Sequence, residues 1–527
     1  MIKTDINLPF GYTDEDIFSA LCAHIPVRRE EICDMRIQKR TLCLTDKSNI
    51  HYKATVAIAL SPEREAGLLK MRKKVSEAED HTLRIPTCRL ESRPIVVGAG
   101  PAGLFAALLL AEAGTMPILV ERGLAVNDRT EKVNLFTKFG ILDPECNIQF
   151  GEGGAGTFSD GKLKVGGMDK YKHKVLSEFI SAGAPEDILY TVGAHVGTDK
   201  LQNIVQNIRQ KIISLGGEVM FSTRLTNIKI KDGSLVSASF ERGGEVFDID
   251  TNHLVLATGH SARDTFEMLK SSGVNMMAKG FGIGLRIEHP REYINDLVYG
   301  KNPPDGIGAA SYHLVTHLPG GRSVYSFCMC PGGSVVAAAS EQGGIVTNGM
   351  SEYRRDGENS NAAFLVSVTP DDFASDDPLA GIELQRKIER RAFTIAGENY
   401  RAPTSSLGSF MNGEKPRLGN VASTYAAGTE LRSAEEYLPD FITNSLRQGI
   451  RDFDLWMSGF YYPDAAMTGP ETRTTSPVRV LRDSNYSAIG ISGLYPTGEG
   501  AGYAGGIVSS ARDGLMVAES IILKHKK

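Results

Sequence analysis

The chain has 527 residues, of which 41% are hydrophobic and 23% charged, and its formal net charge is −5. At roughly 100–200 residues per domain, this length predicts two to four domains with sizeable cores. The slightly acidic balance argues against a protein that seeks nucleic acid through its overall charge. No stretch approaches about 18 uninterrupted apolar residues, and the first residues lack the apolar core of a signal peptide, so neither a membrane span nor secretion is expected.

The seven cysteines, an odd number, are scattered along the chain. None of them forms a C-x-x-C pair, and the only close pair is Cys328 and Cys330. This usage predicts a cytoplasmic protein with no disulfide framework, no zinc site and no other metal centre.

Residues 1–90 are predicted to form a small α+β domain. Local signals give its elements in chain order: a capped amphipathic helix over 13–24, paired strands at 35–44 and 50–60, and a helix beginning at 61–63. The last helix is expected to carry the basic residues Lys70, Arg72, Lys73 and Lys74. This cluster could meet nucleic acid or an acidic partner, but acidic residues follow directly, so a solvated helix face is the favoured interpretation.

A glycine-rich turn at 98–103 is the strongest motif in the chain. A β-branched run at 95–97 leads into Gly98, Gly100 and Gly103, and an Ala/Leu-rich helix follows. In a Gly-x-Gly-x-x-Gly turn the first glycine allows the tight turn, the second lets the backbone approach a pyrophosphate, and the third lets the helix sit close to its strand. Glu121 ends a second predicted strand about 20 residues further on, where a carboxylate can bind the ribose of a dinucleotide. The sequence therefore predicts a dinucleotide site.

A second unusual segment is the loop at 150–162. Its Gly and Ala residues cannot build a core, but Gly154, Ala155 and Gly156 can lie flat against a planar ring and offer N–H donors. Thr157 and Lys162 add polar groups beside them, so a cofactor loop is favoured over a flexible surface loop.

The remaining elements follow from periodicity and turn signals. Apolar spacing predicts a helix over 198–215. Strands are expected at 218–221, 225–230 and 235–240, with hairpin turns at 232–233 and 243–244. A buried strand over 253–259 is expected to lie beside the strand at 95–97, and a late segment at 493–500, followed by a closing helix from about 506 to 523, is expected to return to the same domain. Between them, strands at 282–287, 311–318, 324–329 and 363–368 mix with helices at 379–396 and 434–457.

These patterns predict an α/β protein with a Rossmann-like dinucleotide-binding domain built from discontinuous segments. The expected divisions are an N-terminal α+β domain at 1–90, the binding domain at 91–270 and 484–527, and an inserted α+β substrate domain at 271–483.

Several motifs together resemble a known family. They are the 98–121 pattern, Ala257-Thr258-Gly259, the loop at 149–163, and the stretches 327–333, 471–479 and 495–506. The chain resembles the two-dinucleotide-binding-domain flavoproteins related to glutathione reductase. More closely, it is similar to the largely uncharacterised bacterial FAD-dependent dehydrogenases, also described as NAD(FAD)-utilising dehydrogenases. The resemblance covers nearly the whole chain.

The resemblance implies FAD as the cofactor. By this analogy the glycine turn binds the pyrophosphate, Glu121 the adenosine ribose, and Glu499 the ribityl chain; Arg122 and Arg129 lie near the phosphates, and Leu225 near the adenine. The start of the closing helix approaches the flavin, where a helix dipole favours the negative charge of the reduced ring. The residues expected to contact FAD are Gly98, Gly100, Pro101, Ala102, Gly103, Glu121, Arg122, Arg129, Gly154, Ala155, Gly156, Thr157, Lys162, Leu225, Ala257, Thr258, Gly259, Gly498, Glu499, Gly505, Gly506 and Ile507.

The expected function is an FAD-dependent oxidoreductase that moves electrons between a donor, NAD(P)H among the candidates, and an unknown small organic substrate. Two alternatives stay open, a flavoprotein acting on RNA bases and a non-catalytic flavin-binding protein. A second dinucleotide-binding turn, for a nicotinamide nucleotide, is not predicted from the sequence. The cysteine pair of a disulfide reductase would be expected near the glycine-rich loop, where only Cys146 lies.

Candidate catalytic and substrate residues are few. Cys330, with Cys328 two positions away on the same strand face, is either a redox or nucleophilic residue or a buried packing residue, and packing is the favoured interpretation. His260 is a candidate for proton transfer, with a structural hydrogen bond favoured. Arg473 and Arg479 are candidate clamps for a carboxylate or phosphate, equally well explained by ion pairs at a domain junction. The oligomeric state is left open.

Overall fold

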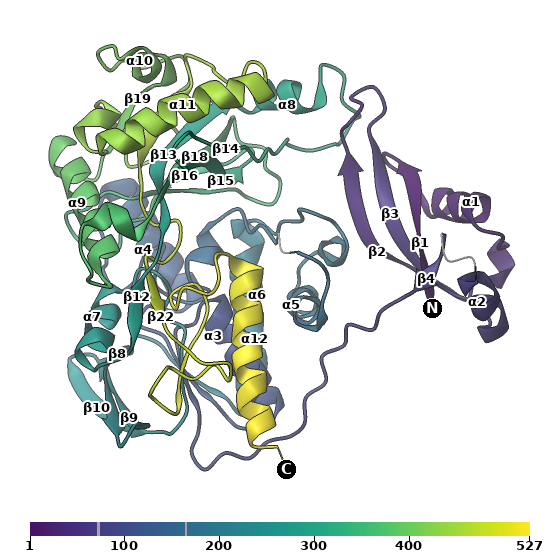
Figure 1. Ribbon diagram of the computed structural model, residues 1–527, viewed down its shortest axis with the longest axis horizontal. Coiled ribbons are helices and arrows are strands. Elements are labelled where there is room, and N and C mark those ends of the chain that lie inside the picture. Colours follow the sequence, from purple (N-terminus) through teal and green to yellow (C-terminus); the bar gives the residue numbers. More distant parts are fainter. Residues whose placement is uncertain (71–73, 164–165, 527) are drawn as a thin grey trace.

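The computed structural model describes residues 1–70, 74–163 and 166–526. A small N-terminal sheet stands to one side, and the rest of the chain forms a larger body around two main sheets (Figure 1). Within the described residues, no helix is both long enough and apolar enough to cross a membrane.

The N-terminal part is a four-stranded antiparallel sheet with the order β2-β3-β1-β4. Its elements follow one another as β1 (Ile2–Pro9), α1 (Asp14–His24), the short η1 (Arg29–Glu31), β2 (Asp34–Cys43), β3 (His51–Ala59), α2 (Pro62–Leu69) and β4 (Ser76–Glu77). This βαββαβ order is that of a ferredoxin-like unit. The predicted α1, β2 and β3 are confirmed.

Two features of this part differ from the expectation. The strand β1 was not predicted, although the buried residues Ile2, Thr4, Ile6 and Leu8 alternate along it as a half-buried strand requires. The helix α2 ends at Leu69, and Glu77 lies in β4, so the long charged helix was wrong. Of its basic cluster, Arg72 and Lys73 lie outside the described residues.

A five-stranded sheet forms the centre of the larger body. It contains β5 (Ile95–Val97), β6 (Ile118–Val120), β7 (Glu218–Met220), β11 (Leu254–Leu256) and β23 (Leu494–Pro496), all parallel, in the order β23-β11-β5-β6-β7. The expected pairing of the returning strand β11 with β5 is confirmed, and the late segment adds β23 beside it.

Alternate residues of these short strands point to opposite faces, and both faces are covered. Val96, Leu119 and Val255 belong to the core formed with α3 (Pro101–Glu112), α5 (Lys170–Ser181), α6 (Thr198–Ser214) and α12 (Ile507–Lys524). Ile95 and Val97 belong to the opposite core, formed with β8 (Arg224–Lys231), β9 (Ser234–Arg242), β10 (Glu245–Asp250) and α7 (Arg263–Ser271). The predicted helix α6, the strand β7 and the hairpin strands β8 and β9 are confirmed, whereas α4 (Val126–Phe139), α5 and α7 were missed.

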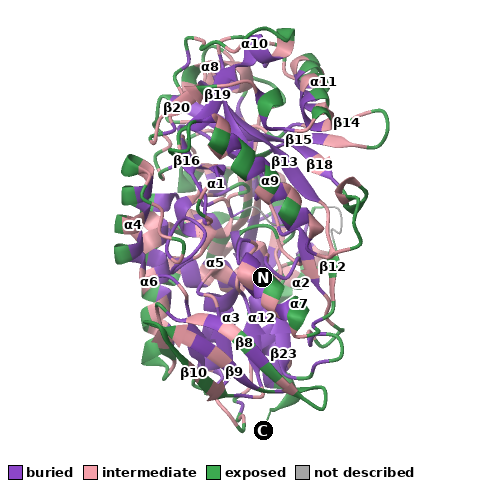
Figure 2. Cartoon of the chain, turned by 90° about the vertical axis from the view of Figure 1, so that its left-hand side faces the viewer, coloured by how far each residue is buried: buried purple, intermediate pink, exposed green. Residues whose placement is uncertain are grey.

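The second main sheet has seven strands in the order β14-β15-β18-β13-β21-β19-β20. They are β13 (Phe281–Pro290), β14 (Val315–His317), β15 (Ser323–Cys330), β18 (Asn359–Val368), β19 (Ala402–Ser406), β20 (Thr429–Leu431) and β21 (Ala466–Glu471). Buried residues gather along β13, β15 and β18 (Figure 2). The expected strand at 311–318 shortens to β14.

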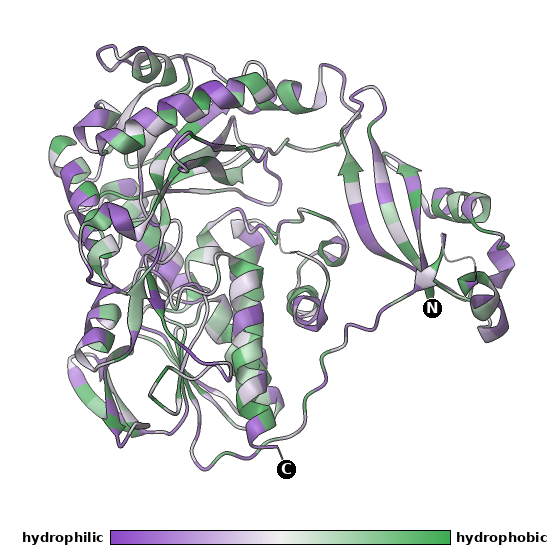
Figure 3. Cartoon of the chain, viewed as in Figure 1, coloured by the Kyte–Doolittle hydropathy of each residue, from purple (hydrophilic) through white to green (hydrophobic). Residues whose placement is uncertain are grey.

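The helices of this region are α8 (Arg291–Tyr299), α9 (Ala380–Ile395), α10 (Leu407–Asn412) and α11 (Asp440–Trp456), with short turns η4 (Pro370–Phe373) and η5 (Ala434–Glu436). In α11 the buried Ile442, Leu446, Ile450 and Phe453 recur at helical spacing, and hydrophilic residues alternate with them (Figure 3). The helix predicted over 434–457 is interrupted, because Pro439 takes an extended conformation as the N-cap of α11.

Two small antiparallel pairs complete the fold. The pair β16 (Ser334–Ala337) and β17 (Thr347–Met350) lies against the second sheet, and β12 (Met276–Ala278) pairs with β22 (Val478–Val480) where the chain enters and leaves that sheet. The site described next lies between the two main sheets.

Candidate functional site

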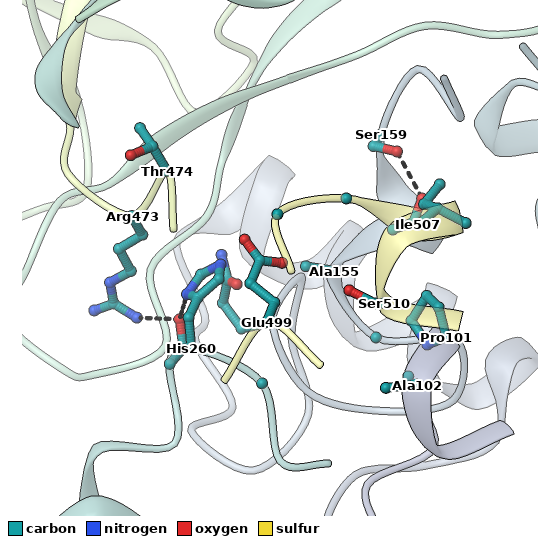
Figure 4. A pocket seen from close by; sticks show the side chains of 18 of the residues that line it. Pro101, Ala102, Ala155, Ser159, His260, Arg473, Thr474, Glu499, Ile507 and Ser510 are labelled. Carbon is teal, nitrogen blue, oxygen red and sulfur yellow. Dashed lines mark hydrogen bonds between the residues drawn. The ribbon is translucent and has the colours of Figure 1, made fainter. Parts of the chain in front are cut away.

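A cavity of about 640 Å³ runs from the glycine turn after β5 to the strands of the second sheet. Its wall includes the loop around η2 (Ala155–Phe158), the turn after β11 and the start of α12. Figure 4 shows His260, Arg473 and Glu499 on one side, and Pro101, Ala102, Ala155, Ser510 and Ile507 on the other. The cavity therefore combines segments that are far apart in the sequence.

Most residues expected to contact a dinucleotide line this one cavity. They are Gly98, Gly100, Pro101, Ala102, Glu121, Arg122, Gly154, Ala155, Gly156, Lys162, Leu225, Ala257, Thr258, Gly259, Glu499, Gly505, Gly506 and Ile507. Of the described residues expected there, Gly103, Arg129, Thr157 and Gly498 do not line it.

The three glycines of the turn have different environments. A Cβ on Gly98 would lie 2.3 Å from the Ala257 carbonyl oxygen, and one on Gly103 would lie 1.8 Å from the carbonyl oxygen of Gly98. Both positions thus require glycine for close backbone packing, and Gly103 acts on α3 rather than on a ligand. A Cβ on Gly100 would touch only Gly154 Cα, at 3.7 Å, so the protein itself leaves room there.

The Glu121 carboxylate joins three loops at the edge of the sheet. It accepts hydrogen bonds from the backbone N–H groups of Ala99 at 2.8 Å, Gly123 at 2.9 Å and Gly151 at 2.9 Å. This buried residue lines the cavity and also holds the glycine turn against the glycine-rich loop.

The two arginines expected near phosphates differ in position. Arg122 lines the cavity and is held by Glu145 and Asp264, each within 3.0 Å. The expectation for Arg129 was wrong: it is fully buried and donates to the carbonyl oxygens of the glycine-rich loop, namely those of Asn147, Ile148, Gly151 and Glu152. Burial lowers the pKa of Arg129 to about 10. Its function is to shape the loop, because a loop rich in glycine has few side chains that could fix its carbonyl groups.

Thr157 and Gly498 also make contacts that hold together the segments around the cavity. Thr157 accepts at its carbonyl oxygen from the Thr198 hydroxyl, which fixes the loop to the start of α6. A Cβ on Gly498 would lie 2.7 Å from the Cβ of Ala102, so this glycine allows contact with α3.

The N-terminus of α12 faces the cavity through glycines. Gly506 is its N-cap, and a Cβ on Gly505 would meet no atom within 4 Å. Glu499 stands nearby, and burial raises its pKa to about 8 although Lys279 opposes the shift. This shift favours the protonated Glu499 carboxyl, the form that can donate a hydrogen bond into the cavity.

His260 lines the cavity, but it is held in its neutral form. Burial, reinforced by Arg473 and Arg263, lowers the pKa of His260 to about 3. Its Nδ1 lies 3.0 Å from the Ser261 hydroxyl, which in turn accepts from Arg473 Nη1 at 3.3 Å. The structural hydrogen bond expected for this histidine is present.

The two candidate clamps are already paired. Arg473 lines the cavity, yet its Nε and Nη2 bind the buried Glu389 carboxylate at 3.0 and 2.8 Å. Arg479 does not line the cavity; it donates to the Gly502 carbonyl oxygen at 3.1 Å and lies over the Tyr503 ring. Arg473 and Arg479 therefore make structural contacts, and the expected role as clamps for an anion is corrected.

The far wall comes from the second sheet and was largely missed by sequence reasoning. Besides Arg473, it consists of Ser311, Tyr312, His313, Ser326, Phe327, Cys328, Met329, Asn348, Glu471 and Thr474. Four of these residues lie in β15, one each in β17 and β21, and the others in the segments before β14 and after β21, so no single motif spacing joins them. The expected Cys330 does not line the cavity, whereas Cys328 does.

Behind this wall lies a fully buried ion pair. Arg286 Nε donates to Glu471 Oε2 at 2.6 Å, and Arg286 Nη2 donates to Glu471 Oε1 at 3.1 Å. The guanidinium also binds Asn361 and Asn348, so its charge and donors are matched by neighbours. This pair fixes the positions of the wall residues Glu471 and Asn348.

Comparisons with known proteins agree with this geometry. Residues 91–133 match a model described as FAD binding domain, and residues 280–474 match one described as FAD-dependent protein, C-terminal domain-like. An uncharacterized protein of Clostridium beijerinckii (strain ATCC 51743 / NCIMB 8052) is 47% identical over 527 residues, covering 99% of this chain and 98% of that protein. The chain belongs to this family of FAD-dependent proteins. FAD is its cofactor.

Solved structures give only distant likenesses. A geranylgeranyl bacteriochlorophyll reductase-like protein of Thermoplasma acidophilum is 11% identical, with 82% of this chain and 78% of that chain covered and a TM-score of 0.38. The flavin-dependent brominase Bmp2 is 10% identical, with 82% and 80% covered and a TM-score of 0.38. Likenesses of this size say nothing about the reaction or substrate of the present chain.

The residues present fit FAD. Glycine at position 100 leaves space against the protein, α3 and α12 both begin at glycines, and the N–H groups of such helix starts suit a pyrophosphate or an electron-rich ring. The protonated Glu499 offers a donor for hydroxyl groups. When FAD is bound, it supplies the electron-transfer chemistry, and the chain supplies orientation and the exclusion of water.

Proposed function

We propose that this protein is an FAD-dependent oxidoreductase that takes electrons from NAD(P)H and passes them to a small organic substrate. The observation that carries the proposal is the single cavity, which joins the dinucleotide turn at Gly98–Gly100 to a polar wall formed by the second sheet. A cofactor site alone would not need that wall. The narrower placement among the NAD(FAD)-utilising dehydrogenases related to glutathione reductase is part of the same proposal.

The wall offers groups for binding a polar substrate. Tyr312 and Ser326 carry hydroxyls and Asn348 carries an amide, and the paired Arg286 and Glu471 hold this end of the cavity in shape. Apolar surface with a few placed polar groups is typical of small-molecule sites. The segment 271–483 is thus proposed as the substrate domain.

The donor must dock transiently, since the dinucleotide turn is used by FAD. Weak docking is consistent with a chain that offers one such turn. Because Arg473 is bound by Glu389, substitution of Arg473 would disturb the fold and is unsuitable as a test of donor binding.

The test is anaerobic mixing of the FAD-loaded protein with NADH and with NADPH in separate runs. Loss of the oxidised flavin band is the expected result with at least one nucleotide. Persistence of the band with both at millimolar concentration would refute the donor assignment. Retention of oxidised flavin with every donor tried would favour the non-catalytic alternative.

The alternative of an RNA-modifying flavoprotein finds no support in the N-terminal sheet. Its face away from the helices carries Lys3, Asp5, Asn7, Lys53 and Thr55, where Asp5 pairs with Lys53 and accepts from Thr55. Sheets of this topology that bind RNA stack bases on aromatic side chains, and these five residues are not aromatic. Salt-dependent binding of RNA to the full chain would contradict this argument.

A further inference from the structure

The strand β15 is irregular where it reaches the cavity. Its pairing with β18 shifts between Phe327, which lies opposite Ala363, and Cys330, which lies opposite Asn361. Two residues of β15 therefore stand opposite one residue of β18, which is a β-bulge. The expectation that Cys328 and Cys330 share a regular strand face was wrong for this reason.

Cys328 occupies the bulge in a left-handed conformation, with φ +47°. Such a backbone is uncommon and energetically unfavourable for a residue with a Cβ. Strained residues of this kind cluster at functional sites. Here the bulge brings Cys328 to the cavity wall while Cys330 is fully buried behind it.

The two cysteines are in direct contact. The Cys330 thiol donates to the Cys328 carbonyl oxygen, with Sγ 3.2 Å from that oxygen. Both cysteines are free. A cavity-facing thiol with a second thiol directly behind it is the arrangement that disulfide exchange requires.

Two cations lie beside this pair. Arg286 Nη1 is 2.9 Å from the Cys328 carbonyl oxygen and 3.9 Å from Cys330 Sγ. Lys162, which also lines the cavity, donates from Nζ to the carbonyl oxygen of Met329 between the two cysteines. A thiolate at Cys328 would thus lie beside two cations, which are themselves paired with Glu471 and Asp160.

The charged surroundings act differently on the two sulfurs. The hydrogen bond from Cys330, with Arg286 and Lys162, lowers the pKa of the Cys328 thiol against the opposing effects of burial and Asp160. The pKa of the Cys330 thiol is raised by the same hydrogen bond and by burial. Two further acidic groups couple to Cys328. Arg286 binds the Glu471 carboxylate, and burial raises the pKa of both Glu471 and Glu499. The asymmetry suits a nucleophile and a resolving thiol.

We propose that Cys328 is the nucleophile and Cys330 the resolving thiol of a thiol–disulfide exchange in the cavity, whose substrate is a small organic disulfide. The Cys328 thiolate attacks one substrate sulfur, a mixed disulfide forms, and the other half of the substrate leaves as a thiolate. Cys330 then attacks the Cys328 sulfur and displaces the second half, which takes up the proton that Cys330 loses. The substrate disulfide is reduced to two thiols, and the cysteine pair is oxidised to a disulfide.

This pair belongs to β15 of the second sheet, not to the glycine-rich loop, where the sequence would place the pair of a disulfide reductase. The return of the cysteine disulfide to the dithiol needs two electrons per cycle, and this part rests on the proposed function, in which NAD(P)H is the source. The exchange itself does not depend on that source, so it can be tested separately.

The test uses the FAD-loaded full chain in which the two exposed cysteines are removed by Cys22→Ser and Cys33→Ser. The reduced protein is mixed with dithiobis(nitrobenzoate), an aromatic disulfide that releases a coloured thiol. A matched control carries Cys328→Ser and Cys330→Ser in addition, and its release is subtracted. Flavin absorbance and circular dichroism report whether each variant is folded.

Beyond the control, we expect about two equivalents of coloured thiol from the Cys328–Cys330 pair, with no adduct left on the protein by mass spectrometry. Cys330→Ser should release about one equivalent and keep the adduct on Cys328, because the resolving step is lost. Cys328→Ser should release none above the control. The proposal would be overturned if the protein with both cysteines releases only one equivalent of coloured thiol and keeps the adduct. It would also be overturned if Cys328→Ser releases as much coloured thiol as the protein with both cysteines.

A second measurement uses a smaller reagent, in case the aromatic disulfide does not reach Cys328. In the unchanged chain, iodoacetamide should alkylate Cys328 at a pH at least about one unit below that needed for the exposed Cys22. The proposal would also be overturned if Cys328 is alkylated only at or above the pH at which Cys22 is alkylated. If thiol–disulfide exchange proceeds but neither nucleotide reduces the flavin, the proposed function is refuted and the role of the cysteine pair is supported. If a nucleotide reduces the flavin but no exchange occurs, only the role of the cysteine pair is refuted.

Discussion

Substitution of Gly100 separates cofactor binding from folding. With φ −76° Gly100 has a backbone conformation that any residue adopts, and a Cβ there meets only Gly154 Cα at 3.7 Å. We therefore expect Gly100→Val to fold with a stability loss of about 1 kcal/mol, the usual cost of a poor N-cap residue. The added side chain instead occupies the space where a pyrophosphate approaches the start of α3.

The loss of FAD affinity can be worked from the contacts at that helix start. Two charge-assisted hydrogen bonds from backbone N–H groups contribute about 1.5–3 kcal/mol each, so their loss totals about 3–6 kcal/mol. This corresponds to an increase in Kd of roughly a hundredfold to ten-thousandfold. Purified Gly100→Val should be colourless, whereas the parent should be yellow, and titration with FAD should give the ratio of the two Kd values.

Two matched variants make the test specific. Gly103→Ala places a Cβ 1.8 Å from the Gly98 carbonyl oxygen, so it should both lose FAD and lower the unfolding temperature markedly. Gly67→Ala, in an open position of α2, should change neither property by a measurable amount. Full FAD occupancy in Gly100→Val, or unfolding as severe as that of Gly103→Ala, would refute the reasoning.

Two further predictions concern buried charges. Arg129→Met should destabilise the protein by about 3–5 kcal/mol in urea unfolding and abolish FAD binding, because four loop carbonyl groups lose a charged donor; a loss below about 1 kcal/mol would contradict the role given to Arg129. The pKa of Glu499 is raised from 4.5 to about 8 in the fold, so the folded state binds more protons between these values and stability should fall as pH rises from about 5 to 8. Because a tenfold change in acidity corresponds to about 1.4 kcal/mol, the ceiling of this loss is about 5 kcal/mol. Thermal unfolding of Glu499→Gln should lack that slope, and an unchanged slope would show that another group titrates.

The sequence by itself determined the cofactor half of this protein. Gly98, Gly103 and the strand pattern around them follow local rules, in which a tight turn and a close helix–strand contact each exclude a side chain. Periodicity likewise predicted α6, because one covered face leaves a regular apolar spacing, and glycine turns predicted β8, β9 and the start of α12. The alternation along β1 was equally present in the sequence and was overlooked.

Only the tertiary structure decided the other half of the site. Arg129 and Arg473 look like phosphate or carboxylate clamps in sequence, but their partners, loop carbonyl groups and Glu389, are set by folding and use up the donors. The far wall takes short runs or single residues from five separate places between Ser311 and Thr474, and only folding brings these places together. A bulge in β15 brings Cys328 to the cavity and buries Cys330, since one extra residue in a strand reverses which side chain faces inward.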